Sequence, residues 1–180
     1  MSCNSPWPMP DFCPARRRWL LAALAWPLSV HAARADAPWQ GLRRWGSGEY
    51  RWLGLPIYEA TLWAGEDPQR PPLVLRLDYR WAIEGAQIAA ASAREMRRLG
   101  GEERQIARWE SRMREIFPSV KSGDSLLGEY RNGRVRFYFN ARLLAEIDDG
   151  DFAEQFFAIW LHPRTSAPAL RTALLGRQAN

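Results

Sequence analysis

Residues 152–176 read FAEQFFAIWLHPRTSAPALRTALLG, and this stretch decides how the rest of the chain packs. Phe152, Phe156 and Trp160 recur at every fourth position, so a helix places all three side chains on one face. An aromatic face of this size is buried either in a hydrophobic core or against a bound ligand. We expect the helix over 152–160 to pack this face onto the inner side of a β-sheet. The sequence leaves open whether a cavity lies beneath it.

The ends of this helix and of a shorter one that follows are marked by characteristic residues. Asp151 begins a capping box with the glutamate three residues later, and Pro163 ends the first helical pattern. A second helix is predicted over 168–175, with Pro168 in its first turn and Gly176 just beyond its end. This shorter helix is expected to close the edge of the sheet.

The N-terminal part of the chain has the features of a secretory signal peptide. Arg16–Arg18 form a basic segment, an apolar run follows over 19–30, and Ala33-Arg34-Ala35 supplies small residues at the cleavage positions. The apolar run is too short to cross a bilayer. The sequence therefore predicts a leader over 1–35 and one mature domain over 36–180. It also predicts a periplasmic or secreted location, with no stable membrane anchor after cleavage.

Most of the excess positive charge lies in this leader. The whole chain has 25 Lys and Arg against 20 Asp and Glu, a net charge of +5. The leader holds four of the basic residues and one of the acidic ones, which leaves 21 against 19, or +2, for the mature domain. A nucleic-acid partner has little electrostatic support at that charge, so none is expected.

Few residues of the mature domain are suited to metal or thiol chemistry. Cys3, Cys13 and His31 lie in the leader, so His162 is the single histidine that remains and no cysteine remains. A zinc site needs several such ligands. The acidic segment DDGD at 148–151 has part of the spacing of a calcium loop but lacks its closing glutamate, so it predicts a turn and a helix cap. We expect no metal and no cofactor.

Three strands are predicted early in the mature domain. In the first, over 49–53, Tyr50 and Trp52 share one face. The second, over 57–63, alternates only in part, which is typical of a strand that is at least partly covered on both faces. A proline-rich break separates them from the clearest strand, over 73–80. In that strand one face carries Leu73, Leu75, Leu77 and Tyr79, and the other carries Arg76, Asp78 and Arg80.

Two amphipathic helices are predicted next, over 86–99 and 102–117, with Gly100 and Gly101 between them. Their remaining positions are rich in arginine and glutamate. An RNA-binding face is one interpretation of the arginines. Because the two signs of charge are interleaved along both helices, a solvated surface with ion pairs between successive turns is the favoured one.

A three-strand meander is predicted after the helices. Asn132-Gly133 is a strong hairpin signal between strands over 124–130 and 134–140, and a tight turn near Asn140 leads into a strand over 142–148. The helices thus come in blocks, and the strands have short antiparallel connections. This order predicts an α+β fold in which helices pack on one face of an antiparallel sheet.

Four segments give the chain a resemblance to a known family. They are GSGEYRWLGLPIYEATLWAG (46–65), SAREMRRLGG (92–101), FPSVKSGDSL (117–126) and the closing stretch over 152–176. In this order they resemble the bacterial chalcone isomerase-like proteins, which are exported relatives of plant chalcone isomerase and of the fatty-acid-binding proteins of that fold. The resemblance covers roughly 42–176. It implies an open-faced β-sandwich, with helices on one side of a large antiparallel sheet.

The resemblance also implies where the chemistry of plant chalcone isomerase would lie. Those enzymes steady a reactive phenolate with an arginine, a tyrosine and a threonine, and these positions fall at Gly48, Ile88 and Ile159 in this chain. The fatty-acid-binding members hold a carboxylate with an equivalent arginine. Without that cation an anionic ligand lacks its counter-charge. Three other arginines remain as substitutes from another direction: Arg44, Arg51 and Arg80.

Two functions follow from these observations. The first is an exported, non-catalytic domain that binds a small apolar ligand such as a fatty acid, or that acts through a protein partner. The alternative is an isomerase acting on a phenolic or unsaturated small molecule, and the replaced family residues count against it. No residue is predicted to be catalytic.

The candidate ligand-binding residues come from the early strands, the meander and the aromatic helix. Tyr58 and Thr61 are separated by an odd number of positions, so they should face opposite sides of one strand, and at most one of them serves a given cavity. The full set of candidates is Arg44, Tyr58, Thr61, Tyr138, Phe156 and Trp160.

Overall fold

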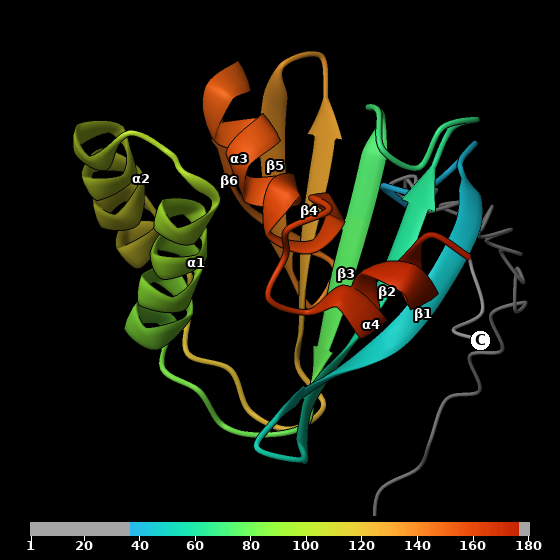
Figure 1. The fold of residues 1–180 in the computed structure, drawn as a ribbon, viewed down its shortest axis with the longest axis horizontal. Coiled ribbons are helices and arrows are strands. Elements are labelled where there is room, and N and C mark those ends of the chain that lie inside the picture. Colours follow the sequence, from blue (N-terminus) through green and yellow to red (C-terminus); the bar gives the residue numbers. More distant parts are fainter. Residues whose placement is uncertain (1–36, 177–180) are drawn as a thin grey trace, which may run out of the picture. The chain divides into compact units, whose positions relative to one another are not determined.

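A computed structural model describes residues 37–176 of the chain. The predicted signal peptide over 1–35 lies outside the described residues and stays a prediction. Within them, six strands form one antiparallel sheet in the order β1-β2-β3-β4-β5-β6, and four helices lie on one face of it (Figure 1). The α+β architecture expected from the sequence is confirmed.

The elements follow the predicted order. The strands are β1 (Arg43–Trp52), β2 (Leu55–Ala64), β3 (Leu73–Tyr79), β4 (Ser125–Arg131), β5 (Arg134–Phe139) and β6 (Arg142–Ile147). The helices are α1 (Gly85–Leu99), α2 (Glu103–Ile116), α3 (Gly150–Leu161) and α4 (Pro168–Leu174). Helix α4 packs on β1 and β2, while α1 packs between α2 and α3.

Strand β1 differs most from expectation, because it begins at Arg43 and not near residue 49. The added part contains Gly46 and Gly48, which have no side chain, and helix α4 lies directly over them. A Cβ atom at Gly46 would lie 2.0 Å from the backbone oxygen of Ala173, and one at Gly48 would lie 2.8 Å from the Ala173 Cβ. These glycines let the helix approach the strand closely. Because glycine has a low strand propensity, the sequence pattern did not predict that β1 begins this early.

The two faces of the sheet differ in chemistry because side chains alternate along each strand. On the inner face, Ala60 pairs with Leu77 and Leu62 with Leu75, and all four are buried. The opposite face carries pairs of arginine and carboxylate side chains, with Arg136 Nε 2.6 Å from Glu146 Oε2. The hydrophobic core therefore lies between the inner face and the helices.

Helix α3 begins at a different cap from the one predicted. The Asp149 carboxylate accepts a hydrogen bond from the Phe152 amide at 3.0 Å and another from Trp109 Nε1 at 2.9 Å. The capping box expected at Asp151 is wrong, since Asp151 already lies inside the helix. The acidic segment over 148–151 does form a turn and a cap, and α3 ends at Leu161, two residues before Pro163.

The hairpin turns of the meander are confirmed by their backbone angles. Asn132 and Gly133 both have positive φ, at 54° and 75°, and so do Asn140 and Ala141 at 47° and 66°. Two successive residues of positive φ form the turn that matches the twist of antiparallel strands. These turns hold β4, β5 and β6 in register.

Charged side chains on α1 and α2 pair with each other at the surface, as the interleaved charges predicted. Arg97 Nε lies 2.9 Å from Glu103 Oε2, and Glu110 accepts bonds from Arg97 and Arg114.

Among residues 37–176, no helix has the length and apolar character needed to span a bilayer.

Candidate functional site

A cavity of about 510 Å³ lies between the inner face of the sheet and helices α1 and α3. The aromatic face of α3 therefore serves two purposes, because part of it packs in the core and part of it lines the cavity. Phe152 is fully buried in the core, whereas Phe156 and Trp160, further along the same face, line the cavity. The volume lies within the range of roughly 300–1,000 Å³ that is typical of small-molecule sites.

The floor of the cavity is the apolar face of the central strands. Leu75 and Leu77 come from β3, Leu126 and Gly128 from β4, and Phe137 from β5. They are neighbours because the register pairs Leu75 with Gly128 and Gly128 with Phe137. The Phe156 ring packs over Gly128, and a Cβ atom there would lie 3.5 Å from the ring, at ordinary van der Waals contact.

One wall of the cavity is formed by aromatic rings that pack edge to face. The centroid of the Phe137 ring lies 5.1 Å from that of Phe117 and 5.1 Å from that of Phe156, and both pairs meet edge-on. The Phe156 ring also lies 5.3 Å from that of Trp160. Such contacts are favourable beyond the area that they bury, so this wall is expected to keep its shape without a ligand.

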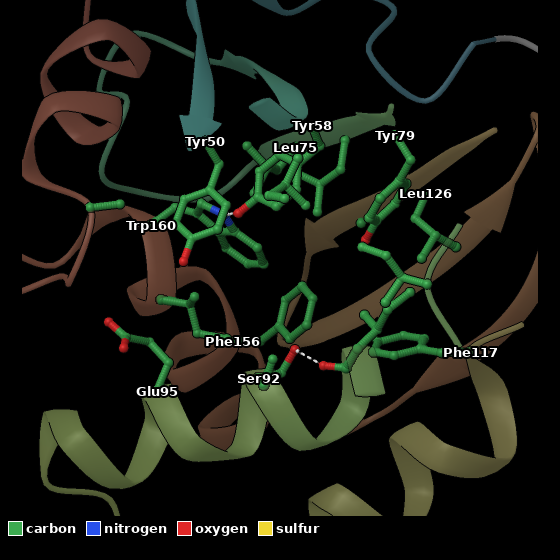
Figure 2. Close-up of a pocket in the computed structure, with 18 of the residues that line it drawn as sticks. Tyr50, Tyr58, Leu75, Tyr79, Ser92, Glu95, Phe117, Leu126, Phe156 and Trp160 are labelled. Carbon is green, nitrogen blue, oxygen red and sulfur yellow. Dashed lines mark hydrogen bonds between the residues drawn. The ribbon is translucent and has the colours of Figure 1, made fainter. Parts of the chain in front are cut away.

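Three tyrosines bring hydroxyl groups to the cavity (Figure 2). Tyr50 and Tyr58 stack with ring centroids 5.0 Å apart, and Tyr79 meets Tyr58 edge-on at 5.7 Å. The Tyr58 hydroxyl accepts a hydrogen bond of 3.0 Å from Trp160 Nε1, which ties strand β2 to helix α3. These three hydroxyl groups thus come from the sheet side of the cavity.

Tyr58 and Tyr79 are donors and not bases. Burial raises the pKa of Tyr58 far above its ordinary value, although the bond from Trp160 opposes that shift. Burial also raises the pKa of Tyr79. Both phenols therefore stay protonated at neutral pH, and each has an O–H group to offer a ligand.

The mouth of the cavity lies beside α1 and the connection from α3 to α4, where charged groups gather. The Glu95 carboxylate accepts hydrogen bonds from Arg98 and from the Ser166 amide, the latter at 2.9 Å. Partial burial alone would raise the pKa of Glu95, but these bonds outweigh it and lower the pKa below its usual value. Glu95 is therefore ionised at neutral pH.

No cation lies inside the cavity among the described residues that line it. The two arginines of the lining, Arg94 and Arg98, are both on α1 and both exposed to solvent. Ile88 and Ile159 line the cavity, so two of the three positions implied by the family resemblance do face it. Gly48 lies beneath Leu170 and Ala173 of α4, which leaves no room for an arginine at the third.

The sequence-predicted site residues divide between the two faces of the sheet. Tyr58, Phe156 and Trp160 line the cavity together. Thr61 lies on the opposite face of β2 from Tyr58, as strand alternation required, and Tyr138 lies on that same outer face, where its hydroxyl donates to Glu129 Oε2 at 2.9 Å. That each of the three lining residues binds a ligand stays a prediction.

The arginines considered as substitutes also lie away from the cavity. Arg44 is exposed at the start of β1 and donates to Ser47 Oγ at 2.8 Å. Arg51 and Arg80 both pair with Glu49 on the outer face. Arg51 Nη2 lies 2.9 Å from Glu49 Oε2, and Arg80 Nη2 lies 3.4 Å from Glu49 Oε1. None of the three supplies a counter-charge to the cavity, because each belongs to the charged surface of the sheet.

Sequence reasoning missed several residues of the cavity. Tyr79 carried a usable signal, since it alternates with Leu75 and Leu77 on the inward face of the clearest strand. Glu95 and Arg98 had no such signal, because they belong to a helix rich in both charges.

Among residues 37–176, no group of three or more His, Cys, Asp or Glu side chains is placed to hold a metal ion.

Comparisons with known proteins agree with this fold. The sequence model described as chalcone isomerase-like matches residues 59–176. An uncharacterised protein of Haemophilus influenzae is 27% identical over 154 residues, which are 83% of this chain and 74% of the relative. The crystal structure of an Arabidopsis thaliana fatty-acid binding protein matches with a TM-score of 0.58 and 9% identity, covering 76% of this chain and 88% of that one. At that identity the structural match shows the fold alone.

Proposed function

Because the chain belongs to the chalcone isomerase-like family, we propose that its cavity binds one small, mostly apolar molecule and that the domain catalyses no reaction on it. The observation that carries this proposal is the cavity itself, about 510 Å³ in volume, with an apolar floor and an aromatic wall. Burial of apolar ligand surface there supplies the binding free energy, at roughly 25 cal/mol per Å² before the costs of association. A fatty acyl chain is the first class of ligand to test.

The absence of catalysis is supported by what surrounds the cavity. Steadying a phenolate or an enolate requires a positive group or several aligned donors beside the reacting atoms. The arginines of the lining are exposed at the mouth and not beside the interior, and one of them, Arg98, is paired with Glu95. Tyr58 and Tyr79 are held in their neutral form by burial, so neither is suited to remove a proton.

The binding role is tested by native mass spectrometry of the protein purified without a delipidation step. We expect a population whose mass exceeds that of the chain by one lipid-like molecule, which organic solvent then releases for identification. Incubation with a chalcone should leave its cyclisation at the rate measured in buffer alone. Ligand binding would be refuted by two results together: the purified chain carries no ligand, and its tryptophan fluorescence does not respond to laurate, methyl laurate or dodecane. Accelerated cyclisation would refute the non-catalytic part.

We also propose that the protein is exported, which is supported by the sequence of residues 1–35 alone. The basic segment Arg16–Arg18, the apolar run and Ala33-Arg34-Ala35 together favour recognition as a signal peptide. We expect osmotic shock of a Gram-negative host to release the protein, with Asp36 as its first residue. Recovery of the uncleaved chain with the cytoplasmic fraction is the result that would contradict export. Replacing Leu20 and Leu21 with arginine provides the matched control that should abolish processing.

A further inference from the structure

The Tyr79 hydroxyl is a polar group of the cavity lining without a protein partner. Tyr79 is 4% exposed, and Figure 2 shows its oxygen directed into the cavity. Among residues 37–176, no backbone or side-chain group forms a hydrogen bond with it. Because no protein group occupies it, this hydroxyl is free to donate to an atom that enters the cavity.

The surroundings of this hydroxyl favour a neutral acceptor over an anion. Leu77 and Leu126 lie on neighbouring inward positions, and no cation is among the described residues of the cavity interior. An ionised carboxylate placed here would lose its hydration without gaining a counter-charge. At the mouth, Arg98 is already paired with the carboxylate of Glu95.

We propose that the cavity selects lipid-like molecules whose polar end is a neutral hydrogen-bond acceptor, such as an ester or ketone oxygen, and that the Tyr79 hydroxyl donates to this oxygen. The inference rests on the proposed binding function and specifies its ligand class. It separates this domain from one that holds a free fatty acid by its carboxylate. The tail of the ligand lies against the aromatic wall formed by Phe117, Phe137 and Phe156.

The test compares three probes that share one chain length: methyl laurate, laurate and dodecane. Each is used to displace the neutral dye Nile red from the full chain at neutral pH. Methyl laurate is expected to bind at least about tenfold more tightly than laurate, since burial of an unpaired carboxylate is costly. Native mass spectrometry gives the number of probe molecules bound per chain.

The variant Tyr79→Phe removes only the hydroxyl oxygen. It should weaken methyl laurate about fivefold, which is the effect of one hydrogen bond, and should leave dodecane unchanged. Tyr130→Phe is the matched control, because Tyr130 is also buried on the inner face of the sheet but does not line the cavity. That control should bind all three probes as the unaltered protein does.

The outcomes separate the two proposals. If laurate binds as tightly as methyl laurate, or if Tyr79→Phe binds the ester with unchanged affinity, the choice of a neutral acceptor is refuted while ligand binding stands. Equal weakening of the ester and of dodecane would also refute it, because that pattern reports a changed cavity shape. If none of the probes displaces the dye or binds to the chain, the proposed binding function fails as well.

Discussion

Replacing Phe152 with alanine is expected to lower the free energy of unfolding by about 3–5 kcal/mol, the usual cost of deleting a fully buried phenylalanine. Phe152 has no exposed surface and lies where helix α3 meets α2 and the sheet. Its ring contacts those of Trp109, Phe137 and Phe156, with centroids 5.5 to 6.1 Å apart. Urea unfolding followed by far-ultraviolet circular dichroism measures the loss.

The matched control for this prediction is an exposed apolar residue. Leu53 is 82% exposed at the turn between β1 and β2, so Leu53→Ala should change the free energy of unfolding by no more than about 0.5 kcal/mol. A loss below about 1 kcal/mol for Phe152→Ala would mean that α3 does not anchor the core. The assignment of Phe152 to the core and of Phe156 to the cavity would then have to be abandoned.

Filling the cavity is expected to abolish ligand binding while the fold is kept. Ile88 lies half-buried on α1 with its side chain in the lining, so Ile88→Trp places a large ring in the space that the ligand would occupy. We expect the affinity for methyl laurate to fall at least about tenfold, which corresponds to about 1.4 kcal/mol. The free energy of unfolding should change little, because the added ring enters an existing void and displaces no packed atoms.

Ile116→Trp is the control for the cavity-filling variant. Ile116 is partly buried on α2 and does not line the cavity, so a tryptophan there adds the same bulk elsewhere. Nile red displacement should show unchanged affinity for this variant. If Ile88→Trp binds methyl laurate as tightly as the unaltered protein, the ligand lies outside this cavity.

Much of the fold could be predicted because its signals are local. Alternation in β3, the Asn132-Gly133 turn and the aromatic spacing of α3 each act within a few residues of the chain. The start of β1 could not be read in this way. Its glycines are explained by contact with α4, which lies more than a hundred residues away in the sequence.

The site was less predictable than the fold for a physical reason. Strand alternation tells which residues share a face, but not which face of the sheet the helices cover. Thr61 and Tyr138 were therefore as plausible as Tyr58 until the register placed them on the outer face. The volume left beneath Phe156 depends on how closely α1 and α3 approach the sheet, and no sequence pattern encodes that distance.

A crystal structure of the protein with methyl laurate tests the central claim most directly. The account predicts one ligand between α1 and the sheet, with its tail against Phe137 and Phe156 and its carbonyl oxygen within hydrogen-bonding distance of the Tyr79 hydroxyl. Ligand density confined to the outer surface, or a cavity closed by side chains at saturating ligand, would contradict it.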